Sequence, residues 1–159
     1  MLSTKYLLYL VSFFSISILC SCEKFEQDEG IQWHKPEKRI QQYSWSISKY
    51  LVDGIDSTDK KKEFLHNATF RFYINDKNSY IASYRTDQDE MPFAFWGINK
   101  KSPDAFFIVI WNNYNAIKLD STFDVNLIRL GGYYKIQKLS NKTLKLKSQE
   151  NFVIDFIGN

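Results

Sequence analysis

Large apolar side chains recur at every second position over most of the chain from residue 43 onward. The alternation is clear in "YSWSISKYLV" (43–52) and in "FRFYI" (70–74). Alternation over about four to eight residues, rich in aromatic and β-branched types, predicts half-buried β-strands. About ten segments show it: 43–52, 68–75, 79–86, 92–99, 105–111, 115–119, 123–130, 132–139, 143–148 and 151–157.

The connections between these segments are short and rich in Asn, Asp, Lys and Ser, which is typical of tight turns. They are "NDKN" (75–78), "NKKSPD" (99–104), "NNYN" (112–115), "SNK" (140–142) and "QEN" (149–151). Gly131-Gly132 suits a hairpin or a β-bulge. Connections this short cannot hold crossover helices, so we expect neighbouring strands to pair antiparallel.

Sequential hairpins predict an all-β fold, namely an antiparallel up-and-down β-barrel of about eight to ten strands. A β-sandwich is the alternative. The helix candidates are short and lie at 35–42 and 58–66. The 159 residues fit one domain, and an aromatic content of 17% supplies a core. The formal charge of +3 is too small to indicate a class of partner.

The first segment has the composition of a secretory signal. "YLLYLVSFFSISIL" (6–19) is an apolar stretch of 14 residues after a single lysine. This length is short for a membrane span and right for the central region of a signal peptide. We therefore expect residues 1–21 to be removed rather than to join the fold.

The two cysteines of the chain are Cys20 and Cys22. A disulfide between them would close a very small, strained ring, and further metal ligands are lacking nearby. The run Leu19-Cys20-Ser21-Cys22 resembles a bacterial lipobox. This resemblance implies that Cys20 leaves with the signal and that Cys22, acylated with fatty acids such as palmitate, begins the mature chain.

On this interpretation the protein is anchored to membrane lipid at the bacterial outer membrane, facing the periplasm or the cell surface. "EKFEQDEG" (23–30) carries four acidic residues against one lysine, so 22–34 is interpreted as an acidic tether before a single barrel domain at 35–159. An acidic stretch in this place also resembles the surface-export signal of Bacteroidetes-type lipoproteins; a plain linker is the alternative.

Two parts of the predicted barrel resemble lipocalin-like, calycin-type lipoproteins of Bacteroidetes-type envelopes. They are "WSISKYLVDGIDST" (45–58) with "FRFYI" (70–74), and the closing "YYKIQKLSNKTLKLKS" (133–148). The resemblance covers about residues 40–157. It implies a barrel in which the early Trp45 plugs one end.

The strand parity predicts which side chains face the lumen. The inward set is Trp45, Phe70, Phe72, Phe93, Phe95, Phe106, Ile108 and Ile110. These bulky residues would either fill the barrel or line a site for a hydrophobic ligand. Trp96 and Trp111 fall on the opposite parity and would form an exposed aromatic patch.

We therefore predict a non-enzymatic module that binds a small apolar or amphiphilic ligand. The alternative is an accessory or structural subunit of a cell-envelope complex with a filled barrel. No motif of a hydrolase or phosphate-binding enzyme is present, and His34 and His66 lack neighbours at metal-ligand spacing. Three aspartates in "DGIDSTD" (53–59) lack the ligand number of a calcium loop. We expect no cofactor, no metal and, given the envelope location, no nucleic acid.

Two features are predicted to lie on the surface of the barrel. The triplets Asp-Ser-Thr at 56–58 and 120–122 resemble O-glycosylation sites of exported Bacteroidetes proteins, at Ser57 and Ser121. Ordinary Asx-turn chemistry is the alternative. A predicted stripe of basic residues on the outer face would meet lipid phosphates or an acidic partner, or would be a solvated strand face. Its members are Lys135, Lys138, Lys142, Lys145 and Lys147.

Overall fold

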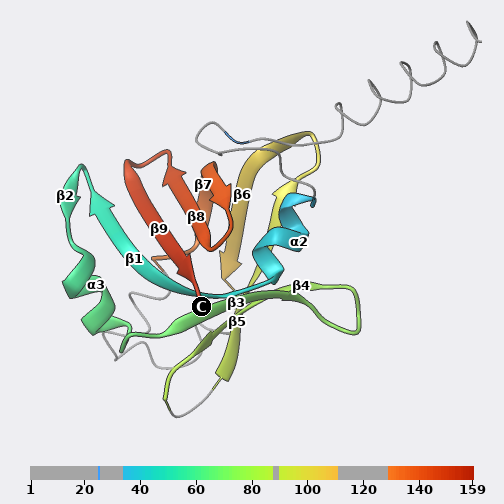
Figure 1. Ribbon diagram of the computed structural model, residues 1–159, viewed down its shortest axis with the longest axis horizontal. Helices are drawn as coiled ribbons and strands as arrows, with labels where there is room; N and C mark the ends of the chain where they lie inside the picture. The colour runs from blue at the N-terminus through green and yellow to red at the C-terminus, as the bar shows by residue number, and fades with distance from the viewer. Residues whose placement is uncertain (1–24, 26–33, 88–89, 111–128) are drawn as a thin grey trace, which may run out of the picture.

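The computed structural model describes Phe25 and residues 34–87, 90–110 and 129–159, which form one antiparallel sheet and two short helices. Nine strands in these residues follow the order β2-β1-β3-β4-β5-β6-β7-β8-β9 (Figure 1). An additional β1–β9 pairing closes eight of them into a barrel, and β2 is an extra strand at its edge. The predicted up-and-down barrel is confirmed, and the β-sandwich alternative is wrong.

The strand bounds are β1 Ser44–Val52, β2 Ile55–Asp56, β3 Thr69–Ile74, β4 Tyr80–Arg85, β5 Glu90–Asn99, β6 Ser102–Ile110, β7 Gly132–Ser140, β8 Thr143–Ser148 and β9 Phe152–Gly158. Eight of them match predicted segments to within a few residues. The predicted strand 115–119 lies outside the described residues, as does most of 123–130, of which Arg129 and Leu130 form a turn. The sequence did not predict β2, a two-residue strand inside an Asp-rich connection.

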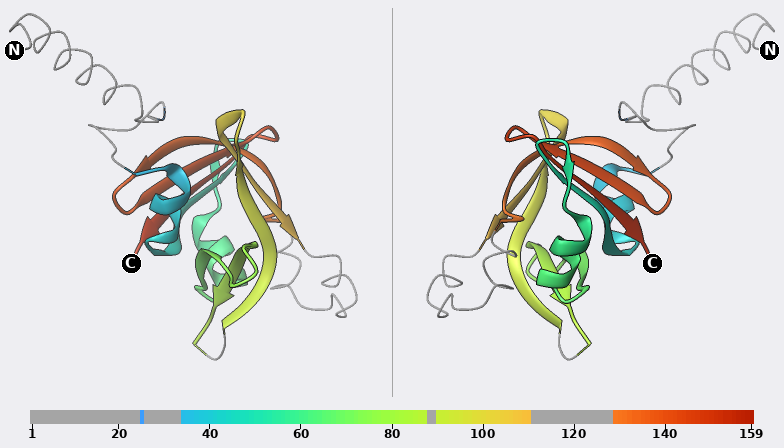
Figure 2. Two further views of the ribbon diagram at one scale, coloured as in Figure 1. Left: turned by 90° about the vertical axis from the view of Figure 1, so that its right-hand side faces the viewer. Right: turned by 90° about the vertical axis from the view of Figure 1, so that its left-hand side faces the viewer.

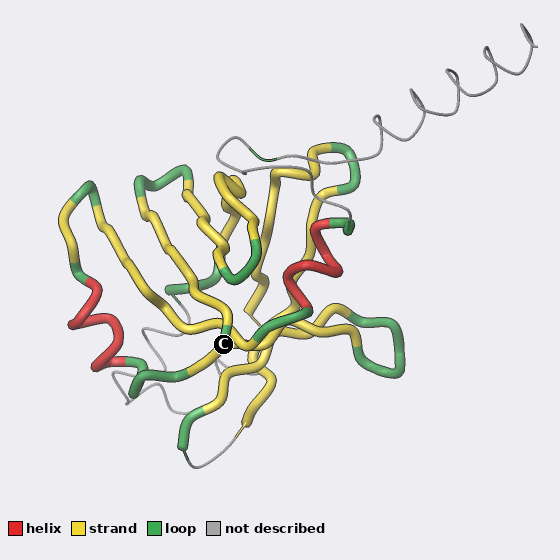
Figure 3. The backbone as a smooth tube through the Cα atoms, viewed as in Figure 1, coloured by secondary structure: helices red, strands yellow, loops and turns green. Residues whose placement is uncertain are grey.

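Both predicted helices are present, as α2 Pro36–Gln41 and α3 Thr58–Phe64. They lie at different ends of the barrel, as the red segments of Figure 3 show. The β3–β4, β5–β6 and β7–β8 turns are at the end of α2, whereas α3, the β8–β9 turn and the start of β7 are at the other end. We call these the closed end and the open end.

Helix α2 closes its end of the barrel. It contacts β3, β5 and β7, which are not neighbours in the sheet, so the helix lies across the barrel rather than against one strand. Trp45 is fully buried beneath it, and its Nε1 donates a hydrogen bond to the Ile40 carbonyl at 2.7 Å. Trp45 therefore plugs this end, as the resemblance at 45–58 implied.

Single-residue bulges in β1, β5 and β7 set which residues face inward. The register shifts leave Ser48 in β1, Phe93 in β5 and Gln137 in β7 without a partner across their ladders. A bulge reverses the facing of every later residue on its strand and bends the strand. Figure 2 shows the resulting curvature of the long β5 (yellow-green) from two sides.

The bulge at Phe93 corrects two predictions. Phe93 and its neighbour Ala94 are both buried, and beyond them the alternation is inverted. Phe95, predicted to face the lumen, is 45% exposed on the outer face, while Trp96, predicted to be exposed, is only 2% exposed. Trp111 lies outside the described residues.

The other predicted inward residues form the core. Phe72 contacts the rings of Trp96 and Phe106, each at 5.6 Å between centroids, and Phe70 contacts Phe156 at 5.9 Å. Edge-on ring pairs add roughly 0.5–1.5 kcal/mol each to the gain from burial. Further members of the predicted set are Phe93 and Ile108, which are buried, and Ile110, which is half-buried. This part of the lumen is filled by its own side chains.

Candidate functional site

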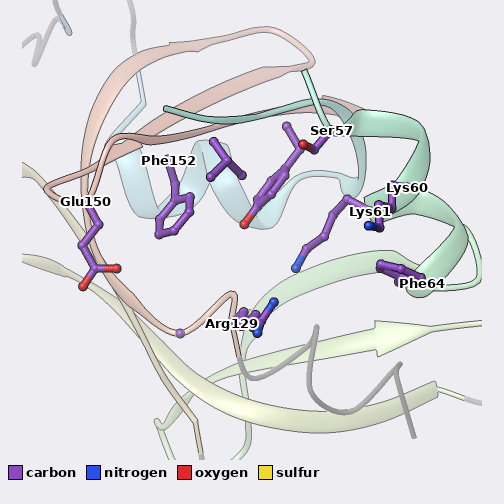
Figure 4. A pocket seen from close by; sticks show the side chains of 10 residues that line it. Ser57, Lys60, Lys61, Phe64, Arg129, Glu150 and Phe152 are labelled. Carbon is purple, nitrogen blue, oxygen red and sulfur yellow. The ribbon is translucent and has the colours of Figure 1, made fainter. Parts of the chain in front are cut away.

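A pocket of about 590 Å³ lies at the open end of the barrel (Figure 4). It lies where β1 ends and β9 begins, under α3 and beside the turn that precedes β7. Its lining consists of Tyr50, Val52, Ser57, Lys60, Lys61, Phe64, Arg129, Gly131, Glu150 and Phe152. Its volume is within the range of about 300–1,000 Å³ that is usual for small-molecule sites.

The Asp-Ser-Thr triplet at 56–58 places α3 over this pocket. The Asp56 Oδ1 accepts hydrogen bonds from the Thr58 backbone N–H at 2.9 Å and from the Thr58 hydroxyl at 2.5 Å. These bonds lower the pKa of Asp56. The Thr58 hydroxyl oxygen in turn accepts the Tyr50 backbone N–H at 2.9 Å, which ties the start of α3 to β1.

This geometry is the Asx-turn chemistry weighed as the alternative for the triplet. Ser57 itself is half-buried and lines the pocket. Glycosylation at Ser57 stays a prediction. Ser121 and Cys22 lie outside the described residues.

The apolar wall of the pocket is made by aromatic rings. Tyr50 and Phe152 stack at 6.3 Å between centroids with an interplanar angle of 16°. Val52 and Phe64 extend this surface from β1 and α3. Burial raises the pKa of the Tyr50 phenol, so the ring acts as a neutral surface at physiological pH.

Lys61 projects from α3 into the pocket (Figure 4). The residue is only 4% exposed, and its Nζ lies 4.9 Å from the centroid of the Tyr50 ring, within range of a cation–π contact. Burial, with a smaller contribution from the nearby Arg129 guanidinium, lowers the pKa of Lys61 to about 8. A buried ammonium beside a second cation is unusual, because both effects oppose its charge.

A buried hydrogen bond positions the turn that carries Arg129. The Tyr134 hydroxyl donates to the Leu130 carbonyl at 2.8 Å, and burial raises the pKa of that phenol well above its usual range. Of the described residues that line the pocket, Glu150 alone is acidic, and Figure 4 shows it on the far side from Lys61, beyond Phe152. The described lining thus has an apolar wall, a cationic side and the carboxylate of Glu150.

The structure places the predicted ligand-binding residues elsewhere. Trp45, Phe70, Phe72, Phe93, Phe106 and Ile108 pack in the core, and Phe95 faces outward; none of the seven lines the pocket. Sequence reasoning missed Tyr50, Lys61 and Phe152. One signal was available, since Lys61 is four residues before the apolar Leu65 and so shares its helical face in the predicted helix 58–66.

The predicted lysine stripe is on the outer face, as expected. Lys135 pairs with Lys147 and Lys138 with Lys145 across β7 and β8. The neighbouring β9 supplies Asp155 directly opposite Lys145. A carboxylate in the row fits the interpretation of a charged strand face better than that of an uninterrupted basic surface.

A group of apolar side chains lies beside this stripe, on the outer face of β5, β6 and β7. Phe95 pairs with Val109, and the ring of Phe107 lies 6.2 Å from that of Tyr133. Val109 is 48% and Tyr133 71% exposed. We call Phe95, Phe107, Val109 and Tyr133 the outer patch.

The histidines and the aspartates of 53–59 do not form a metal site in the described part of the chain. His34 and His66 are exposed; His34 precedes α2 and His66 follows α3. Asp53, Asp56 and Asp59 are also exposed and lie in a turn, in β2 and in α3, respectively. Among the described residues, no three His, Cys, Asp or Glu side chains gather where they could hold a metal ion.

No protein-family model matches this chain, and no curated protein matches it with significance. Within the residues that the structure describes, neither helix is long and apolar enough to span a membrane.

Proposed function

We propose that this chain is a lipid-anchored envelope protein whose barrel binds a small apolar or amphiphilic ligand in the open-end pocket. The observation that carries the proposal is the contrast within one lumen. Rings fill the barrel below, whereas about 590 Å³ lined by Tyr50, Val52, Phe64 and Phe152 stays open above. An apolar pocket with a few polar groups is the usual form of a small-molecule site.

The proposed anchor is the acylated Cys22, in a lipoprotein of the bacterial outer membrane. Phe25, three residues later, belongs to the hydrophobic core, and its ring centroid lies 5.7 Å from the guanidinium carbon of Arg39 in α2. Three residues span at most about 11 Å. The closed end therefore lies next to the membrane, and the pocket opens away from the lipid.

The anchor is tested by Cys22→Ala in the full chain. The variant should keep its signal and carry no acyl group, as measured by the intact mass of the protein extracted from membranes. Normal cleavage and acylation of the variant would refute the anchor and leave the pocket proposal untouched.

Ligand binding is tested by native mass spectrometry of the full chain in lipid nanodiscs, with identification of bound small molecules. Val52→Phe adds a ring inside the pocket and should displace the bound molecule. The matched control is Val109→Phe, which adds the same ring on the outer face and should retain it. A bare mass for the unmodified chain, together with no uptake of added amphiphiles, would overturn the proposal.

The outer patch favours a second candidate function, that of an accessory subunit in an envelope complex. Exposed apolar side chains beside Lys135 and Lys147 resemble the make-up of a protein interface. On this alternative, Tyr133→Glu should release a stoichiometric partner protein without changing the occupancy of the pocket. Retention of that partner would argue against the patch.

A further inference from the structure

The cationic side of the pocket indicates what kind of head group its ligand carries. Among the described residues that line the pocket, three are basic, namely Lys60, Lys61 and Arg129, and Glu150 alone is acidic. These four side chains together have a formal charge of two positive. In a partly enclosed site such an excess attracts anions and repels cations.

Lys61 is the least expected member of this group. Its neighbours in the chain, Lys60 and Lys62, are exposed and half-buried, whereas Lys61 is turned inward and is only 4% exposed. The Tyr50 ring faces its ammonium group, and the Arg129 guanidinium raises the unfavourable local charge further. A bound anion would relieve this repulsion and would accept charge-assisted hydrogen bonds from both groups.

The apolar wall lies next to these cations. Tyr50 contacts Lys61 through its ring face and Phe152 through the stacked pair, so a polar subsite and an apolar subsite share one residue. A ligand that satisfies both has an anionic head attached to an apolar body. Glu150, beyond Phe152, stays away from the head group.

We infer that the pocket recognises a small anionic amphiphile whose carboxylate or phosphate head pairs with Lys61 and Arg129 while its apolar body lies on Tyr50 and Phe152. The inference rests on the proposed function, because it names the chemical class of the ligand for the same pocket. Arg129 suits a planar, two-oxygen contact with either head group, and Lys61 supplies a point charge.

The test compares three short, soluble amphiphiles that partition weakly into lipid: hexanoate, hexyl phosphate and hexanol. Their affinities for the full chain in nanodiscs are measured by titration calorimetry, with empty discs as the blank. At least one anion should bind about tenfold more tightly than hexanol, which is the usual magnitude of a charge-assisted contact. The tighter of the two anions then identifies the head group.

Variants assign the effect to residues. Lys61→Met and Arg129→Met should each remove most of the preference for the anion while changing the affinity for hexanol less than about twofold, so retained hexanol binding also reports an intact pocket. Glu150→Gln should strengthen anion binding. Lys62→Met is the matched control on the same helix, since Lys62 does not line this pocket, and it should leave all three affinities unchanged.

The outcomes separate the two proposals. Equal affinity for hexanol and both anions, or an anion preference that survives Lys61→Met and Arg129→Met, would overturn this inference and leave the proposed function standing. No measurable binding of any of the three amphiphiles would overturn both.

Discussion

The two ends of the barrel are built from the same strands but are completed in different ways. At the closed end, α2 lies across the strands and Trp45 is fixed beneath it by a hydrogen bond to Ile40. At the open end, α3 places the buried Lys61 beside Phe64 over the lumen, and a pocket stays beneath the helix. The comparison teaches that a closed sheet alone does not decide whether its lumen is filled; the short helix at each end does.

The largest effect is expected at the closed end. Trp45→Ala removes a fully buried ring at a site walled by α2 and the strands, so the cavity cannot readily collapse. We expect a loss of about 3–5 kcal/mol in the free energy of unfolding, measured by urea denaturation. Phe152 lies at the open end and is half-buried, so Phe152→Ala should lower the free energy of unfolding by clearly less. Equal losses would remove the distinction between the two ends.

At the open end, replacement of Lys61 should stabilise the protein. The pKa of Lys61 is about 8 in the folded chain and 10.5 in the reference state. Below pH 8 the unfolded chain thus holds this proton more tightly, and the buried charge destabilises the fold by up to about 3 kcal/mol. Lys61→Met should be more stable by a part of this amount at pH 7.

The pH dependence sharpens this prediction. The wild type gains stability relative to the variant as pH rises from 8 to 10.5, because its folded state has already lost the proton there. The difference in unfolding free energy between the two proteins should therefore narrow over this range. A difference that is constant with pH would mean that Lys61 acts through packing rather than charge.

Two glycines test the packing of the ends at a smaller scale. A Cβ on Gly158 would lie 2.8 Å from the Tyr43 Cγ and 3.2 Å from the Lys142 Cα, so Gly158→Ala should cost about 1–3 kcal/mol. Gly54, near the open end, has nothing within 4 Å of that position, and only its φ of 82° opposes a side chain. Gly54→Ala should therefore cost about 1 kcal/mol. Thermal unfolding of both variants should show the larger shift for Gly158→Ala.

A further effect concerns anion binding and its dependence on pH. If the head group pairs with charged Lys61, the affinity for hexanoate should fall by up to about tenfold between pH 7 and pH 9. The loss of affinity with rising pH should be absent in Lys61→Met. That variant keeps the other titratable and charged groups around the site, namely Lys60, Arg129, Glu150 and Tyr50. Calorimetric titrations of both proteins at the two pH values decide the point.

The sequence predicted the barrel because apolar and polar residues alternate within single segments such as 43–52 and 70–74, and this local pattern indicates half-buried strands. It also predicted α2 and α3, whereas the plugging role of Trp45 was implied only by the resemblance at 45–58. The facing of Phe95 and Trp96 was predicted wrongly, because one extra residue at Phe93 inverts everything after it on β5. A bulge depends on the partner strand, so alternation along a single strand does not reveal its position.

The pocket could not be predicted for a different reason. Tyr50, Lys61, Arg129 and Phe152 come from four segments separated by up to about a hundred residues, and only the β1–β9 closure brings the first and the last together. Lys61 in particular stands in a run of three lysines, which is typical of a solvated helix. Its burial follows from the direction in which Asp56 and Thr58 start α3.

The division between a filled core and a lined pocket has a consequence for how such a chain can diversify. The rings that hold the barrel together, such as Phe70 and Phe72, are not among those that line the pocket. Substitutions on the inner face of α3 and in the neighbouring turns can therefore change what the pocket accepts while the folding core is untouched. A lineage of such proteins could acquire new ligand preferences without passing through an unstable intermediate.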